Sequence, residues 1–380
     1  MTVIVTDAKY RSSLSVIRAL AKCGHDIVLT QTMGDSSPSI PSFSSRYVTR
    51  TVRLDCSADD ADGYLLALTS LIREYDHPVV FPIGAKTLAL IAAHRDALAE
   101  KCSFTVCDKD TLELANDKLR VALAARELGI KTPPTYTSAD GAEFPVIIKP
   151  VCGEKFGLTA KDRYTVVNSR EDFDAAYEKM SRYGGEPIIQ KKITGIGIGV
   201  SLLMDQNGKA VSAICHRRVR EYPVSGGPSA CCESFYDEGL VKMSERLLKK
   251  LNFTGMAMVE YKLDGDEISS DNAYLLEINP RVWGSFPLTF VADTSFASDY
   301  VELSSGNSVS HPLDNYKIGV RMNFILSDLA AILSLIKRGR FKEGAKGIFD
   351  IILHRAVDGM KDKTDKAPFR KYLKLKIFKK

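Results

Sequence analysis

The stretch Tyr274-Leu275-Leu276-Glu277-Ile278-Asn279-Pro280-Arg281 decides how the rest of this chain is interpreted. Its apolar residues predict a buried strand, and successive strand side chains point to opposite faces. Glu277, Asn279 and Arg281 therefore project from one face. A carboxylate and an amide oxygen suit a hard cation such as Mg²⁺, and a guanidinium grips an anionic phosphate or acyl phosphate. This combination indicates nucleotide chemistry.

A second strand pattern, Met258-Val259-Glu260-Tyr261-Lys262, lies upstream of the first. If the two strands are neighbours, Glu260 can stand beside Glu277. A carboxylate and an amide on one strand are a weak signal alone, because strands often carry solvated polar residues on one face. The interpretation therefore depends on the other motifs of the chain.

Two lysines supply cations at the ends of secondary-structure elements. Phe144-Pro145-Val146-Ile147-Ile148-Lys149-Pro150 predicts a short buried strand that holds Lys149 at its end. Asn116-Asp117-Lys118 opens a helical pattern over residues 119–128. Between the strand of Lys149 and the next strand, a loop containing Gly153 and Gly157 can lay backbone N–H groups over phosphates. That next strand ends in Gln190-Lys191-Lys192-Ile193.

The order of these motifs resembles the ATP-grasp superfamily, in particular the carbamoyl-phosphate-synthase-like carboxylate–amine ligases, over about Val3 to Asp293. The resemblance implies two cofactors, ATP and Mg²⁺, with Mn²⁺ as an alternative metal. It also implies roles for residues: phosphate contacts from Lys118, Lys149 and the loop of Gly153 and Gly157; adenine contacts from Gln190, Lys191, Lys192 and Ile193; metal binding by Glu260, Glu277 and Asn279; and catalysis by Arg281 and Lys149.

The segment between residues 190–193 and the strands of Glu260 and Glu277 is the candidate acceptor site. Its residues are Arg217, Arg218 and Arg220, followed by Gly226 and Gly227. Arginines at a strand end are more often solvated than ligating, but similar segments lie near the acceptor in the resembled ligases. Ser285 is equally suited to bind substrate or to pack, whereas Trp283 is more simply a core anchor and His216 a packed or exposed strand residue.

The hydrophobic periodicity predicts an α/β protein. Strands at residues 3–5, 26–29 and 79–81 alternate with helices at 14–22, 65–75 and 86–101, which predicts a parallel sheet without a Gly-x-Gly-x-x-Gly dinucleotide motif. With the resemblance, we expect an ATP-grasp fold divided into an N-terminal α/β domain (1–110), one lobe with the glycine loop (111–189), a second lobe with the metal strands (190–325) and a helical basic extension (326–380).

Composition is compatible with an intracellular enzyme. The 380 residues are 45% hydrophobic, which suffices for two or three packed domains. No apolar run approaches the ~20 residues that span a bilayer. None of the eight cysteines forms a Cys-x-x-Cys pair, so reduced thiols are expected. These features predict a soluble, cytoplasmic protein.

The last twenty residues, 361–380, are strongly basic. Nine Lys or Arg minus two Asp give a net charge of +7, against +5 for the whole chain. Bulky apolar residues are interleaved with these charges, as in segments that bind an anionic membrane at the inner face; the alternative is a terminal helix packed on the body. Nucleic acid is not an expected partner, because the basic residues occupy only this end.

The function implied by the resemblance is ATP-dependent joining of a small carboxylate to an amine through an acyl phosphate, and a homodimer is compatible with it. Two alternatives stay open. One is a relative that forms an acyl phosphate or thioester, and the other is a nucleotide-binding regulatory protein without turnover. The full set of lysines, carboxylates, asparagine and arginine argues against the last of these.

Overall fold

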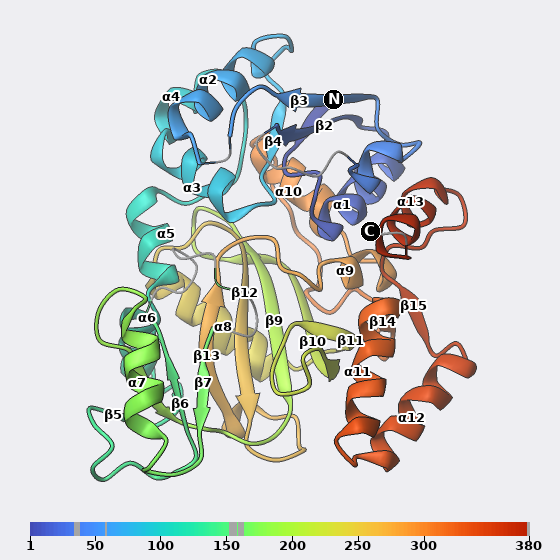
Figure 1. Cartoon of the computed structure of the whole chain (residues 1–380). Coiled ribbons are helices and arrows are strands. Elements are labelled where there is room, and N and C mark those ends of the chain that lie inside the picture. Colours follow the sequence, from blue (N-terminus) through green and yellow to red (C-terminus); the bar gives the residue numbers. More distant parts are fainter. Residues whose placement is uncertain (34–38, 58, 152–157, 159–162, 378–380) are drawn as a thin grey trace.

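The computed structural model describes residues 1–33, 39–57, 59–151, 158 and 163–377, which form three β-sheets with flanking helices (Figure 1). The N-terminal sheet has the strand order β3-β2-β1-β4, and its paired strands are parallel. Its elements are β1 (Thr2–Val5), α1 (Arg11–Lys22), β2 (Asp26–Thr32), β3 (Arg50–Leu54), α2 (Ala61–Ile72), β4 (Val79–Phe81) and α3 (Ala85–Ala93). The predicted parallel sheet is confirmed.

One predicted helix is divided in two. The pattern over residues 86–101 predicted a single helix, but α3 ends at Ala93 and α4 (Arg95–Ala99) begins two residues later. His94 between them leaves helical geometry, with φ −118° and ψ 27°. Apolar spacing alone does not reveal such a break, because both short helices bury their apolar residues in the same core.

A seven-stranded sheet occupies the centre of the molecule, in the order β13-β12-β9-β10-β11-β14-β15 (Figure 1). One face is covered by α8 (Glu238–Lys250), and the other packs against the N-terminal domain through a cluster that includes Trp283. The strands are β9 (Gly197–Met204), β10 (Ala210–Glu221), β11 (Ser229–Phe235), β12 (Gly255–Leu263), β13 (Ala273–Asn279), β14 (Arg321–Asn323) and β15 (Ala356–Asp358).

A smaller antiparallel sheet with its own core lies beside the central one. Its order is β5-β8-β6-β7, with α7 (Phe173–Ser181) packed on it. The strands are β5 (Thr135–Tyr136), β6 (Val146–Lys149), β7 (Thr165–Val167) and β8 (Ile188–Lys191). Helices α5 (Lys109–Asn116) and α6 (Lys118–Glu127) contact β13, so they connect the N-terminal domain to the central sheet.

The remaining elements are helices. The extension predicted over residues 326–380 is mostly helical, but it also contributes β15 to the central sheet. Short helices α9 (Pro287–Val291) and α10 (Phe296–Ser304) pack under α1, whereas α11 (Ile325–Lys337) and α12 (Phe341–Ile352) form a hairpin at the other end (Figure 1). Trp283 is 1% exposed and packs edge-to-face on Phe286 and Phe296, so the prediction that it anchors the core is confirmed.

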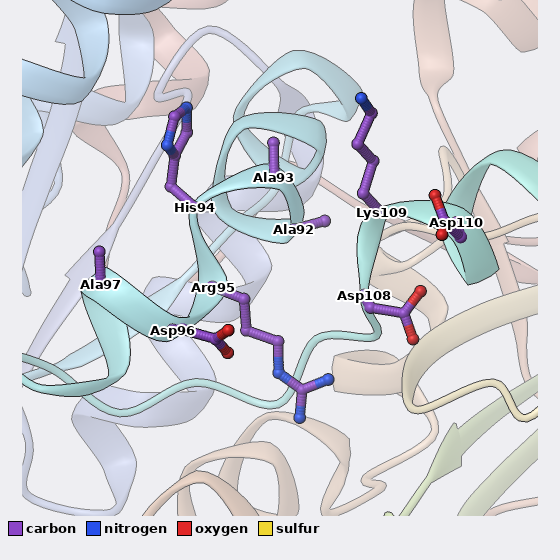
Figure 2. A pocket seen from close by; sticks show the side chains of 9 residues that line it. All are labelled: Ala92, Ala93, His94, Arg95, Asp96, Ala97, Asp108, Lys109 and Asp110. Atoms are coloured by element: carbon purple, nitrogen blue, oxygen red, sulfur yellow. The ribbon is translucent and has the colours of Figure 1, made fainter.

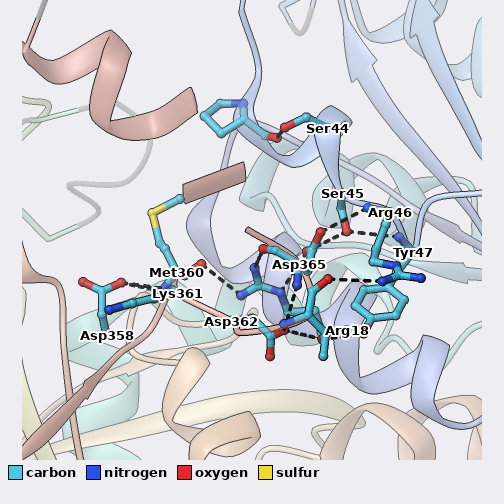
Figure 3. A network of polar contacts seen from close by, with 12 residues as sticks. Arg18, Ser44, Ser45, Arg46, Tyr47, Asp358, Met360, Lys361, Asp362 and Asp365 are labelled. Carbon is cyan, nitrogen blue, oxygen red and sulfur yellow. Dashed lines mark hydrogen bonds and ion pairs between the residues drawn. The ribbon is translucent and has the colours of Figure 1, made fainter. Parts of the chain in front are cut away.

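The basic C-terminal segment folds back onto the N-terminal domain (Figure 3). Buried Asp365 receives hydrogen bonds from Arg18 at 3.1 Å and Ser45 at 2.8 Å, and Arg18 also donates to the Met360 carbonyl at 3.0 Å. Helix α13 (Ala367–Ile377) then lies on η1 (Pro41–Ser44), where Phe369 and Tyr372 pack on the core.

This docking corresponds to the packed alternative for residues 361–380. Two of the bulky apolar residues that lie among the charges of this segment, Phe369 and Tyr372, pack on the core. The cost of freeing them includes an exposed apolar surface and a broken buried ion pair between Arg18 and Asp365. In the part of the chain that the structure describes, no helix is both long and apolar enough to cross a bilayer.

Candidate functional site

The two predicted metal carboxylates are brought face to face by strand register. In the antiparallel pair β12–β13, Glu260 and Glu277 are direct partners, and Met258 is opposite Asn279. The Asn279 amide donates to Glu260 Oε2 and to Glu277 Oε1, both at 3.4 Å. These are long hydrogen bonds, so the three side chains form a loose cluster of oxygen donors rather than a closed network.

Lys118 reaches this cluster from the start of α6. The Asp117 side chain caps the helix by accepting hydrogen bonds from the N–H groups of Leu119 and Arg120. This cap fixes the start of the helix, and with it the position of the Lys118 side chain. Lys118 Nζ lies 3.2 Å from Glu277 Oε2. The predicted phosphate lysine and the predicted metal carboxylate are therefore adjacent.

Lys149 ends β6, as the sequence indicated. Its pKa responds to burial and to the charges of Lys118, Glu277 and Glu260. Burial lowers the pKa of Lys149, and the positive charge of Lys118 lowers it further, to about 8, although Glu277 acts in the opposite direction. An ammonium with so depressed a pKa is under-compensated by the protein alone. An anionic ligand at this position would stabilise it.

The two carboxylates of the site have pKa values driven apart. Burial tends to raise the pKa of Glu277, but Lys118 and Lys149 outweigh burial and hold it at about 2. Burial raises the pKa of Glu260, which Arg218 opposes and the neighbouring charge of Glu277 reinforces. Paired carboxylates with opposite shifts are typical of sites that bind or transfer charge.

Arg218 lies between Glu260 and Glu221. Its guanidinium donates to Glu260 Oε1 at 2.5 Å and to Glu221 Oε1 at 3.2 Å. Gly197 on β9 makes room for it, because a Cβ there would lie 3.0 Å from Arg218 Cδ. Within the described residues, Arg218 Nε is buried without a hydrogen-bond partner, so its N–H is available to donate to a ligand.

His216 and Ser285 meet beside the site. His216 Nε2 and Ser285 Oγ lie 3.2 Å apart, and both residues are buried. Burial, assisted by the charge of Arg218, lowers the pKa of His216 to about 3. The imidazole is thus neutral at physiological pH, and it is a poor proton acceptor there.

Arg281 lies two residues after the end of β13, beside the proposed oxygen donors. Its Nη1 donates to the Val282 carbonyl at 3.1 Å and its Nη2 lies 3.5 Å from Asn279 Oδ1. The guanidinium therefore stands next to the oxygen donors, on the face that the period-two pattern of residues 277–281 predicted.

Arg217 and Arg220 lie on the other face of the sheet from Arg218. Arg217 pairs with Glu233, and Arg220 binds Asp328 at 2.5 Å and Asp350 at 2.8 Å. A register shift in β10 between Arg218 and Arg220 turns the strand, which separates two residues that regular alternation would have put on one face. The structure does not bring the three predicted acceptor arginines together.

Gly226 and Gly227 lie in a tight loop that contacts the small sheet. Gly226 has φ +126°, and Tyr164 donates from its hydroxyl to the carbonyls of Ser225 at 2.9 Å and Gly226 at 3.1 Å. A Cβ on Gly226 would collide with that hydroxyl, and one on Gly227 with the backbone of Tyr222. The glycines thus allow the loop to lie against Tyr164.

Residues 190–193, which the sequence analysis expected to contact adenine, connect the small sheet to β9. The N–H of Lys191 donates to Pro134 and that of Lys192 to Pro145, while the Lys191 side chain pairs with Glu143 at the surface. Gln190 is buried, 3.4 Å from Thr135 Oγ1, and Ile193 follows immediately. Gly153 and Gly157, predicted to cover phosphates, lie outside the described residues.

Four charged or polar residues near the site were missed by the sequence analysis. They are Arg163, Tyr164, Glu221 and Lys262. The charged groups among them interact electrostatically with Glu260, Glu277 or Arg218. Lys262 could have been found, because it follows Glu260 by two residues in one strand. The others come from loops and strand ends, where no periodicity identifies them.

The donor set fits a magnesium ion that is also held by phosphates. Among the described residues, no group of three or more His, Cys, Asp or Glu is placed to hold a metal by itself. Glu260, Glu277 and the Asn279 amide offer hard oxygen ligands, and Mg²⁺ commonly takes only one or two carboxylates together with substrate phosphates.

A separate pocket of about 580 Å³ lies where α3, α4 and α5 meet (Figure 2). Residues 92–97 and 108–110 line it, with Arg95 and Asp108 as its central charged side chains. None of its lining residues is a predicted site residue. It is distinct from the carboxylate cluster.

Comparison with known proteins identifies the domain that carries this cluster. A family described as "ATP-grasp domain" matches residues 115–285, which include Lys118, Lys149, Glu260 and Glu277. Residues 115–285 are an ATP-grasp domain. The carbamoyl phosphate synthase large chain of Xylella fastidiosa is 22% identical to this chain over 234 residues, 57% of this chain and 21% of that protein. The chain thus spans about a fifth of the length of that relative.

Solved ATP-grasp structures share the fold over most of the chain. A biotin carboxylase–β,γ-ATP complex from Campylobacter jejuni has a TM-score of 0.64 at 15% identity, covering 84% of this chain and 74% of that one. The biotin carboxylase domain dimer of Hydrogenobacter thermophilus 2-oxoglutarate carboxylase, solved with MgADP, ADP and bicarbonate, has 0.63 at 14%, covering 84% and 73%. An L-amino acid ligase from Bacillus licheniformis has 0.59 at 15%, covering 81% and 75%. The predicted ATP-grasp fold is confirmed.

Proposed function

We propose that this protein is an ATP-dependent ligase that joins a small-molecule carboxylate to an amine, with Mg²⁺ as cofactor. The observation that carries the proposal is the pair Glu260 and Glu277, placed opposite each other on neighbouring strands with Lys118 at 3.2 Å from Glu277. Two carboxylates beside two lysines, Lys118 and Lys149, can bind a metal and the phosphates that share it. The ATP-grasp domain and the likeness to an L-amino acid ligase support it.

The ionisation states of the free protein favour this use of the site. With its pKa at about 2, Glu277 is fully ionised at neutral pH. Lys149, with a pKa of about 8, carries most of its charge and gains a partner when a phosphate approaches. Bound Mg²⁺ would neutralise negative charge on the phosphate oxygens during transfer.

The proposed reaction has two steps. A substrate carboxylate oxygen attacks the γ-phosphorus of ATP, the bond to ADP breaks, and an acyl phosphate results. An amine then attacks the activated carbonyl, phosphate leaves, and the amine's proton passes to solvent. In this proposal Lys118, Lys149 and Arg281 hold the transferred group, and the proposed adenine contacts come from Gln190, Lys191, Lys192 and Ile193.

For the acceptor we propose the face of β10 that carries Arg218, with Ser285 and the Gly226–Gly227 loop nearby. Arg218 is next to Glu260 and has an unpartnered Nε among the described residues. We leave Arg217 and Arg220 out of the acceptor site, because Glu233, Asp328 and Asp350 engage them on the opposite face. The domain division at residues 110, 189 and 325 remains part of the proposal.

The decisive experiment is a screen of amino acids and small acids for ADP release. A ligase releases ADP and phosphate only when both an acid and an amine are present. ADP release with the acid alone, together with a hydroxamate on adding hydroxylamine, would instead favour the acyl-phosphate-forming alternative. ATP binding without ADP release for any pair would favour the nucleotide-binding regulatory protein.

A further inference from the structure

The hairpin of α11 and α12 turns a row of large apolar side chains away from the protein. On α12, Phe341, Ile348, Phe349 and Ile352 are all exposed, with Phe349 at 61% and Ile352 at 66%. Their spacing puts them on one helical face, next to exposed Leu353 at the helix end. On α11, Leu329 and Leu333 are exposed as well. Monomeric soluble proteins rarely expose large contiguous apolar patches, so this face is expected to be covered by a partner.

The outward orientation is fixed by packing on the inner face. Gly344, Gly347 and Asp350 of α12 are buried. A Cβ on Gly344 would lie 2.5 Å from Ile336, and one on Gly347 would lie 2.6 Å from Ile332, so the two glycines let α12 approach α11 closely. Asp350 is held by Arg220 at 2.8 Å. Because these contacts are buried, α12 cannot rotate to hide its apolar residues without breaking them.

Positive charge borders this apolar face. Five basic residues of the hairpin are exposed, and Glu343 is the only exposed acidic residue among residues 325–353; the five are Lys337, Arg338, Arg340, Lys342 and Lys346. Glu343 is itself paired with Arg340. By helical geometry Lys342 and Lys346 lie on the edge of the face next to Phe349. A second copy using the same face would bring these cations against their equivalents, whereas an anionic surface complements them.

We propose that the α11–α12 hairpin is a docking surface for an anionic lipid bilayer, on which α12 lies flat with its apolar face in the headgroup region. Apolar insertion and attraction of the basic rim to anionic lipid reinforce each other in such helices. The hairpin lies at one end of the molecule, away from the N-terminal domain (Figure 1). It is joined to β10 through Arg220, two residues after Arg218 of the candidate site.

The test is co-sedimentation of the full chain, without ATP or substrates, with vesicles of phosphatidylcholine mixed with phosphatidylglycerol. The wild-type chain is expected to bind these vesicles more weakly as salt is added, and to bind pure phosphatidylcholine poorly. Phe349→Glu combined with Ile352→Glu is expected to reduce vesicle binding by about tenfold or more, because two inserted apolar side chains become charged.

Two controls separate the hairpin from other surfaces. Leu66→Glu changes an apolar residue of α2 that is 70% exposed, and it is expected to leave binding unchanged. Lys374→Gln with Lys376→Gln removes two exposed charges of α13, whereas Lys342→Gln with Lys346→Gln removes two from α12. The α12 pair is expected to weaken binding more. Unchanged melting temperatures establish that the variants are folded.

Four results would overturn the proposal. One is no binding of the wild-type chain to the anionic vesicles. Another is full binding by the Phe349→Glu, Ile352→Glu variant. A third is loss of binding only on changing Lys374 and Lys376. The fourth is a wild-type dimer, seen by sedimentation velocity, that the α12 variant splits while vesicles bind neither protein. In that case the face is an interface between copies of the chain.

Discussion

Two clusters of arginines and carboxylates flank the same strand, β10, and they differ in how completely they are satisfied. Around Arg220, the guanidinium makes hydrogen bonds to Asp328 at 2.5 and 3.0 Å and to Asp350 at 2.8 Å, and both carboxylates are fully buried. Arg321 also reaches Asp350, at 3.2 Å, and pairs with Glu233.

The cluster around Arg218 is less complete. Arg218 Nε lacks a partner among the described residues, and Asn279 contacts both glutamates only at 3.4 Å. Lys149 has its pKa lowered to about 8 rather than stabilised as a cation. A saturated cluster holds the fold together, while an unsaturated one keeps polar groups available for a ligand. The comparison therefore supports a structural role for Arg220 and our proposal that Arg218 binds a ligand.

The largest expected effect is on stability. Arg220→Ala leaves Asp328 and Asp350 buried without their main partner, so the free energy of unfolding is expected to fall by about 3–5 kcal/mol. Urea denaturation measures it. Arg218→Ala, the matched change two residues away, is expected to destabilise less, since Glu260 and Glu221 remain partly exposed. Equal losses in the two variants would break the distinction between the clusters.

The next effect is on turnover. Glu277→Ala or Asn279→Ala removes an oxygen donor from the proposed metal site, and we expect ADP release to fall by about a hundredfold or more. The fold should be largely kept, which circular dichroism can verify. Wild-type activity in either variant would refute the metal assignment.

Arg218→Gln sharpens the acceptor assignment. If Arg218 binds an anionic acid, its loss should raise the Michaelis constant for that acid by about tenfold and that for ATP by less, since a hydrogen bond to a charged group is lost. Arg217→Gln is the matched control on the opposite face and should change neither constant strongly. A uniform rise in both constants for Arg218→Gln would indicate a general defect of the site.

The smallest effect concerns pH. Lys149 has a pKa of about 8 in the free protein, and phosphate contact should raise it. ATP affinity is then constant below pH 8 and falls as pH rises through that value, by up to about tenfold per unit until the bound pKa is reached. Isothermal titration calorimetry measures the decline and the accompanying proton uptake.

Two substitutions at Lys149 test whether this lysine causes the decline in ATP affinity above pH 8. Lys149→Arg should keep the charge and remove the decline, and Lys149→Ala should bind ATP weakly at every pH. If wild-type ATP affinity is flat between pH 7 and 9, or if Lys149→Ala binds ATP normally, the lysine does not contact phosphate.

Much of the site could be predicted from local sequence. The period-two spacing of residues 277–281 put Glu277, Asn279 and Arg281 on one face, and Asp117 marked the helix start that positions Lys118. Both signals are local, because strand alternation and helix capping depend on neighbours within a few residues. The family resemblance added the fold.

Other features were decided only by tertiary structure. A bulge in β10 separates Arg218 from Arg220, and the partners that identify the second as structural, Asp328 and Asp350, come from helices more than a hundred residues later. The position of residues 361–377 depended on Arg18, far away in sequence, which binds Asp365. Sequence patterns indicate which side chains share a face of one helix or strand. Which partner covers that face is determined by long-range packing, and local periodicity carries no information about it.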